Sequence, residues 1–109
     1  MGLFDGILGG AVSGVLVTAL NSLVEKHGGI QGVVKEFEQK GLGETVKSWV
    51  GTGENKPITP AQVHQAVGAD TLKELAAKTG LSTEELAAKL AQILPAAIDK
   101  ATPNGRVPA

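Results

Sequence analysis

The sequence predicts an all-α protein, a compact orthogonal bundle of six to seven short helices preceded by an apolar, glycine-rich N-terminal helix. Apolar residues recur with the 3.6-residue period of an α-helix through most of the 109 residues. Glycine- and proline-containing segments separate these amphipathic stretches. No stretch of useful length alternates apolar and polar residues as a half-buried strand does. Short helices with short connections favour an orthogonal bundle around one core.

The composition limits both the core and the class of ligand. Hydrophobic residues make up 42% of the chain, but its aromatic residues are only Phe4, Phe37 and Trp49, so the core must consist mainly of Ala, Val, Leu and Ile. Ten basic residues nearly balance eleven acidic ones, whereas nucleic-acid modules usually carry a strong basic excess. Cysteine is absent, which excludes disulfides and thiolate metal sites and suits the cytoplasmic location that we expect.

The N-terminal segment is the most apolar part of the chain. We expect one helix over residues 3–26, stopped by Gly28 and Gly29. Residues 6–24 carry no charge, and this length approaches that of a membrane span. Glycine, serine, threonine and asparagine dilute the stretch, and no basic residue precedes it as in a secretory signal. We therefore expect neither a membrane helix nor a signal peptide.

Helix-start and helix-stop signals divide the rest of the chain. Apolar stripes predict helices over residues 30–37 and 42–50, followed by a loop over residues 51–57. Thr59 and Gln62 form a capping box around Pro60, and Gly68 ends the helix that they start. We expect Asp70 to cap the following helix, which ends at Gly80.

The last helix has the clearest signature. Ser82 and Glu85 predict a second capping box, and apolar residues from Leu86 to Leu94 line one face. Pro95 should kink or end this helix, although residues 96–101 can continue as helix. We therefore divide the chain into an apolar helix (residues 1–27), a helical domain (28–102) and a flexible tail (103–109).

Three segments have a distinctive wording. They are GLGETVKSWVGTGENKPIT at residues 41–59, the Leu72–Gly80 spacing followed by Leu81 and Ser82, and AQILPAAIDKATPNGRVP at residues 91–108. Together these segments resemble the YidB-like family of bacterial proteins. The resemblance covers about residues 28–108. It implies a compact, homeodomain-like helical fold in proteins of uncharacterised function, and it supplies no established catalytic residue, cofactor or ligand.

A series of small residues marks the predicted first helix. Gly6, Gly10 and Gly14 recur every four residues, and Thr18 and Ser22 continue the series. Because such a ridge lets two helices approach closely, we predict self-association into a homo-oligomer or filament. The residues assigned to this contact are Gly6, Ile7, Gly10, Val12, Gly14, Leu16 and Leu20. The alternatives are that the helix covers its own core, or lies on a membrane although it lacks a basic face.

Residues 72–94 form a candidate helix-turn-helix, with two helices joined by a glycine-containing turn. In a DNA reader the start of the second helix enters the major groove. Here that start carries Glu84 and Glu85, with Lys73, Lys78 and Lys89 as the only compensation. We favour a structural helix pair, and keep a nucleic-acid-binding module or a cytoplasmic adaptor as alternative functions.

The remaining candidates favour ordinary structural roles. Trp49 is a candidate anchor for a protein partner, but its spacing from Leu42 favours the core. His27 and His64 lack ligand-type neighbours at helical spacing, so we expect no metal site, no cofactor and no catalytic residue. The predicted function is a non-enzymatic structural or interaction protein that self-associates, without nucleic acid or membrane as partner.

Overall fold

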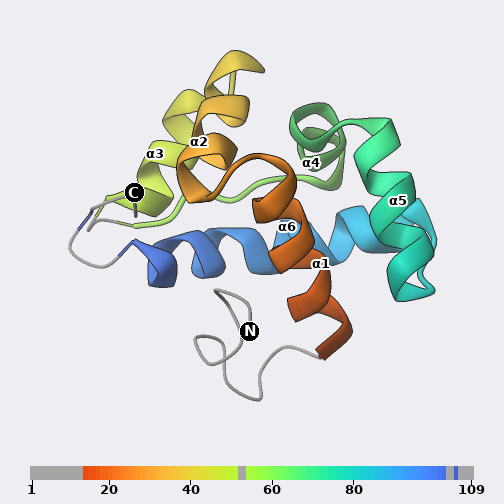
Figure 1. Ribbon diagram of the computed structural model, residues 1–109. Helices are drawn as coiled ribbons and strands as arrows, with labels where there is room; N and C mark the ends of the chain where they lie inside the picture. Colours follow the sequence, from red (N-terminus) through yellow and green to blue (C-terminus); the bar gives the residue numbers. More distant parts are fainter. Residues whose placement is uncertain (1–13, 52–53, 103–104, 106–109) are drawn as a thin grey trace.

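The computed structural model describes residues 14–51, 54–102 and 105, and this part of the chain is all-α (Figure 1). Its helices are α1 (Gly14–Lys26), α2 (Ile30–Gln39), α3 (Gly43–Val50), α4 (Pro60–Val67), α5 (Ala69–Thr79) and α6 (Thr83–Ala101). The described residues contain no strand. The predicted all-α bundle is therefore confirmed, with six helices in the described part.

The longest helix, α6, packs against α3, α4 and α5. Helix α1 crosses it in Figure 1 and packs mainly against α5 and α2. Leucine side chains supply most of the large, fully buried residues, as the composition predicted. Phe37 and Trp49 meet edge to face with their ring centroids 5.5 Å apart, which is a favoured aromatic geometry.

Helix α1 shares this core with the helices that follow it. Its side chains Leu16, Ala19, Leu20, Leu23 and Val24 all belong to the same buried cluster as the side chains of α5 and α6. The division at residue 27 therefore does not correspond to a break in the described core. Among the described residues, we find no helix that combines the length and the hydropathy needed to span a lipid bilayer.

The connection between α1 and α2 depends on glycine. Gly28 and Gly29 adopt positive φ angles of 81° and 102°, and the Gly29 amide donates to the Val24 carbonyl at 2.8 Å. Gly32 lies in the first turn of α2, where a Cβ atom would overlap the backbone carbonyl of His27. The chain can therefore reverse tightly between two packed helices only because this position has no side chain.

Two of the three predicted caps are present. Thr59 accepts from the Gln62 amide at 3.1 Å while Gln62 accepts from the Thr59 amide at 3.0 Å, so the capping box is complete. The Ser82 hydroxyl accepts from the Glu85 amide at 3.1 Å, as an N-cap does. The Glu85 carboxylate accepts from the Ser82 hydroxyl at 3.3 Å, and not from the Ser82 amide as in a complete capping box.

The prediction that Asp70 caps α5 is wrong. The N-cap of α5 is Gly68, whose carbonyl already accepts from the Leu72 amide at 3.1 Å. Gly68 also ends α4, with φ at 93°, so α5 starts immediately after that turn. Asp70 consequently lies inside the first turn of α5.

Pro95 does not end α6, which runs on to Ala101. The Pro95 carbonyl accepts a hydrogen bond from Asn55 Nδ2 at 3.4 Å, and the same amide group lies 3.3 Å from Asp99 Oδ2. Nearby, the Trp49 indole donates to the Lys56 carbonyl at 2.7 Å. These bonds attach the extended segment before α4 to α3 and α6.

Candidate functional site

The residues predicted for self-association lie at the N-terminus, and only some of them are described. Gly6, Ile7, Gly10 and Val12 lie outside the described residues. Leu16 and Leu20 are 8% and 0% exposed and belong to the core of their own chain. Their side chains therefore do not form part of the accessible surface of α1.

The opposite side of α1 remains accessible. Gly14 and Thr18 are exposed and Ser22 is half-buried, so the described part of the small-residue series turns away from the core. A Cβ atom on Gly14 would meet nothing within 4 Å. Val15, at 45%, is the exposed large apolar side chain in the described part of the chain. We call Gly14, Val15, Thr18 and Ser22 the outer face of α1.

The polar groups near this face are engaged within the chain. The Thr18 hydroxyl donates to the Gly14 carbonyl at 3.0 Å, so this hydroxyl has a hydrogen-bond partner within its own helix. At the other end of α1, Lys26 forms an ion pair with Glu74 of α5. The hydrogen bond from Lys26, together with its charge, lowers the pKa of Glu74 below the ordinary value of 4.5. This contact helps to fix α1 against α5.

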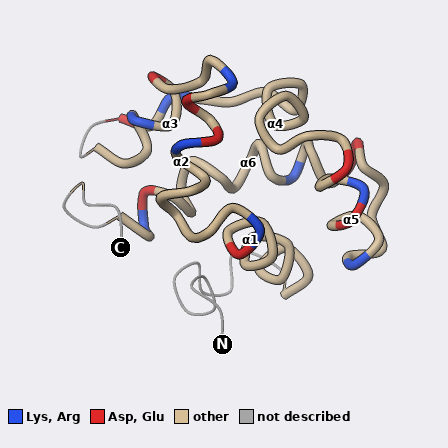
Figure 2. The backbone as a smooth tube through the Cα atoms, turned by 45° about the horizontal axis from the view of Figure 1, so that its top comes forward, with Lys and Arg blue, Asp and Glu red and all other residues tan. Residues whose placement is uncertain are grey.

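The helix-turn-helix order is also present in the structure. Helix α5 ends at Gly80, which adopts the left-handed conformation with φ at 74° and donates its amide to the Ala76 carbonyl at 2.9 Å. Helix α6 begins three residues later with Glu84 and Glu85, both exposed. Figure 2 shows lysines and acidic residues interspersed along these helices.

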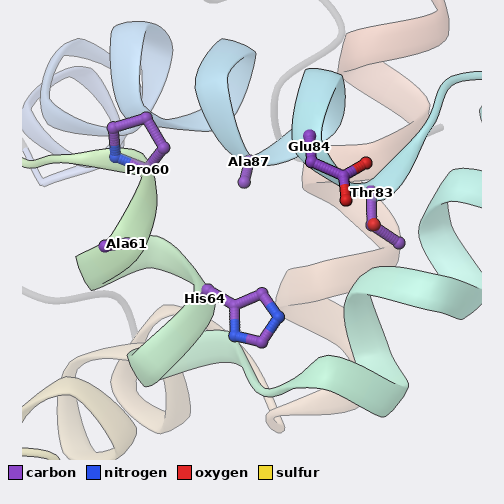
Figure 3. A pocket seen from close by; sticks show the side chains of 6 residues that line it. All are labelled: Pro60, Ala61, His64, Thr83, Glu84 and Ala87. Carbon is purple, nitrogen blue, oxygen red and sulfur yellow. The ribbon is translucent and has the colours of Figure 1, made fainter.

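A shallow pocket of about 260 Å³ lies between the starts of α4 and α6. Its lining consists of Pro60, Ala61 and His64 from α4 with Thr83, Glu84 and Ala87 from α6. In Figure 3 the His64 imidazole extends from α4 toward the side on which Thr83 and Glu84 begin α6. His64 is exposed, and the structure places no second histidine in the pocket. The pocket itself was missed, because the meeting of α4 with α6 is a tertiary contact that no local pattern signals.

Trp49 is a core residue and not a surface anchor. Its side chain is 0% exposed, packs against Phe37 and donates to the Lys56 carbonyl. The interpretation favoured by its spacing from Leu42 is therefore correct, and the structure offers no accessible indole for a partner. The described residues also contain no group of three or more His, Asp or Glu side chains arranged to hold a metal ion.

Comparisons with known proteins agree with the resemblance seen in the sequence and extend it. The sequence model of the YidB-like protein family matches residues 1–109, including the first 27 residues. The uncharacterised protein YidB of Escherichia coli K12 is 33% identical over 110 residues, which cover 98% of this chain and 83% of that protein. A solved homeodomain-like protein of unknown function from Shigella flexneri superposes with a TM-score of 0.77 at 31% identity, covering 95% of this chain and 84% of that one.

Proposed function

The chain belongs to the YidB-like protein family, and we propose that it is a non-enzymatic interaction protein of the bacterial cytoplasm that self-associates through its N-terminal helix. The observation that carries this proposal is the outer face of α1. An exposed valine and small side chains lie there without charge, although α1 already buries its other side in the core. A face of small, uncharged residues around an exposed valine, which the other described residues leave uncovered, favours a protein contact.

A second copy of the chain is the partner that this face fits best. Residues 14–24 of α1 hold no charge, so the outer faces of two α1 helices can meet without desolvating an ionised group. The formal net charge of the whole chain is only −1, which leaves little repulsion between copies. Small residues such as Gly14 and Ser22 permit close approach of two helix backbones, as in other helix pairs with small residues four apart.

The non-enzymatic part of the proposal is supported by the side-chain chemistry available. The sequence has no cysteine and no tyrosine, and its two histidines are His27 and His64. The pocket that includes His64 brings one imidazole and one carboxylate together with apolar and hydroxyl groups, without a nucleophile held by a base. The cysteine-free composition suits the cytoplasmic location.

The test is a substitution on the outer face of α1 in the full chain. Val15→Glu places a charge in the proposed contact without touching the core, and it should shift the protein toward monomer in light scattering over a concentration series. Ala77→Glu, at an exposed position of α5, is the matched control and should behave like the parent chain. Equal masses for parent and Val15→Glu at every concentration would overturn the proposal.

Truncation is a less informative test than substitution. A chain starting at Gly28 would lack Leu16, Ala19, Leu20, Leu23 and Val24, which are all buried in the core. Losing that much apolar burial would destabilise the fold, at about 25 cal/mol per Å² of apolar surface. A change in mass after such a deletion would then report on unfolding rather than on the contact.

The second candidate is a nucleic-acid-binding module, favoured by the helix-turn-helix order of α5 and α6 and by the homeodomain-like relative. The mixed charges on these helices argue against it, because phosphate binding needs a basic surface. A gel-shift assay with mixed duplex DNA at low salt separates the two functions. Binding of duplex DNA at low salt would favour the nucleic-acid-binding module. If the protein is monomeric and binds no duplex, a cytoplasmic adaptor is the remaining candidate.

A further inference from the structure

The pocket between α4 and α6 has a composition that selects its ligand. We propose that it binds the side chain of an arginine in an extended peptide, and that the occupant is the segment Arg106-Val107-Pro108 of a second copy of the chain. The contact is separate from pairing through the outer face of α1, because it uses α4, α6 and the C-terminal segment.

The chemistry of the pocket favours a cation with an apolar stem. Pro60, Ala61 and Ala87 contribute apolar surface, and Glu84 contributes the carboxylate. The neighbouring Glu85 is already hydrogen-bonded to Ser82, whereas no described cation forms an ion pair with Glu84. Arginine covers apolar surface with its methylene groups and binds a carboxylate through its guanidinium group, and an imidazole such as His64 offers it a planar surface to stack on.

The position of the pocket agrees with a basic peptide rather than a nucleic acid. In a helix-turn-helix reader, the start of the second helix presents hydrogen-bond donors and positive charge to DNA. Here the same end of the helix pair presents Glu84 beside an apolar hollow (Figure 3). The Glu84 carboxylate disfavours a phosphate group beside it and complements a cationic side chain.

The sequence contains one segment that matches this requirement. Arg106 is the only arginine in the chain, and Val107 and Pro108 follow it directly. Arginine complements the charge of Glu84, and the two apolar residues complement the surface formed by Pro60, Ala61 and Ala87. These three tail residues lie outside the described part of the chain.

The chain between α6 and Arg106 is too short for the segment to bind the pocket of its own copy, which favours binding to another copy. Helix α6 has 19 residues and carries Glu84 at its start, so Thr102 lies roughly 27 Å from Glu84 along the helix. The four residues from Thr102 to Arg106 span at most about 14 Å when fully extended. Arg106 therefore falls short of the pocket of its own chain. A tail bound to a neighbour joins two different surfaces, which is a head-to-tail contact that can propagate into chains.

The proposal is tested by titrating an acetylated peptide of residues 102–109 into the ¹⁵N-labelled full chain carrying Arg106→Ala, so that the tails of other labelled copies do not compete with the peptide. Amide shifts should be confined to the residues around Ala61, His64, Thr83, Glu84 and Ala87. We expect weak binding, with a Kd on the order of 0.1–1 mM, that weakens further as salt is added.

Matched variants identify the contact. Glu84→Gln in the labelled chain should weaken binding by about 2- to 5-fold, the range of an exposed ion pair, while Glu85→Gln should leave it unchanged. Both positions are exposed, so both variants should fold, which circular dichroism checks. The peptide carrying Arg106→Ala should not bind.

Three results would overturn the proposal: no shifts at millimolar peptide, shifts away from the pocket, or equal binding by the Arg106→Ala peptide. A scrambled peptide that binds equally well would overturn the second copy as occupant. Adding Val15→Glu to the labelled chain should not alter peptide binding, so failure of either proposal can be recognised without the other.

Discussion

At the scale of single residues, close packing decides which positions tolerate change. Gly32 is helical, and alanine at a helical position is normally favoured over glycine by about 1 kcal/mol. At this position a Cβ atom would overlap the His27 carbonyl, which is backbone and cannot rotate away. The steric cost therefore outweighs the gain in helix propensity. The sequence did not single out Gly32, because the clash depends on how α1 meets α2.

Gly32→Ala is expected to destabilise the protein by about 1–3 kcal/mol, the usual cost of overpacking. Urea denaturation followed by circular dichroism measures this change. Gly43→Ala is the control, because a Cβ atom there reaches only ordinary contact at 3.5 Å with the Glu38 side chain. Gly43→Ala should be as stable as the parent protein or slightly more stable. If Gly32→Ala were as stable as the parent, the turn between α1 and α2 would be able to shift and accept the Cβ atom.

At the scale of elements, local signals predicted the helices well where the chain carries both start and stop residues. Thr59, Pro60 and Gln62 specify the start of α4 through their own hydrogen bonds, so sequence was sufficient. Asp70 carried a cap-type side chain, but the positive φ of Gly68 sets the start of α5 earlier. Pro95 lies within α6, whose packing against α3 and α4 maintains the helix despite the missing amide. Tertiary contacts therefore explain both departures.

The capping box of α4 yields a prediction about coupling. Thr59→Ala should cost about 1 kcal/mol of folding stability, because the Gln62 amide loses its acceptor at the start of an eight-residue helix. Gln62→Ala should cost less, and the double variant should cost less than the sum, since the two bonds support each other. Denaturant unfolding of the four proteins gives the coupling, and strict additivity would contradict a reciprocal box.

The Lys26–Glu74 ion pair between α1 and α5 predicts a pH dependence. Because the folded state lowers the pKa of Glu74, the ionised carboxylate stabilises the fold above the ordinary pKa of 4.5, and this contribution is lost as the pH falls through the lowered value. Parent and Glu74→Gln should therefore differ in urea midpoint at about pH 6 and converge toward about pH 3. The difference should be small because the ion pair is exposed. A difference in urea midpoint that stays constant across this pH range would show that ionisation of Glu74 does not contribute to stability.

At the scale of the whole molecule, fold class was predictable from sequence but the functional surface was only partly so. The first helix is apolar on most sides, and sequence cannot say which side a core will take. The structure buries Leu16 and Leu20 and leaves Gly14, Val15 and Thr18 outside. The proposed contact thus retains Gly14 from the predicted set and gains Val15. The pocket around His64 and Glu84 forms only when α4 and α6 are brought together.

Self-association through α1 can be measured as the light-scattering mass of the intact chain over a wide concentration range. We expect the mass of the parent and of Ala77→Glu to rise above that of one chain as concentration increases. The mass of Val15→Glu should stay closer to that of one chain. A parent protein that remains monomeric at the highest concentration would show that α1 does not mediate self-association.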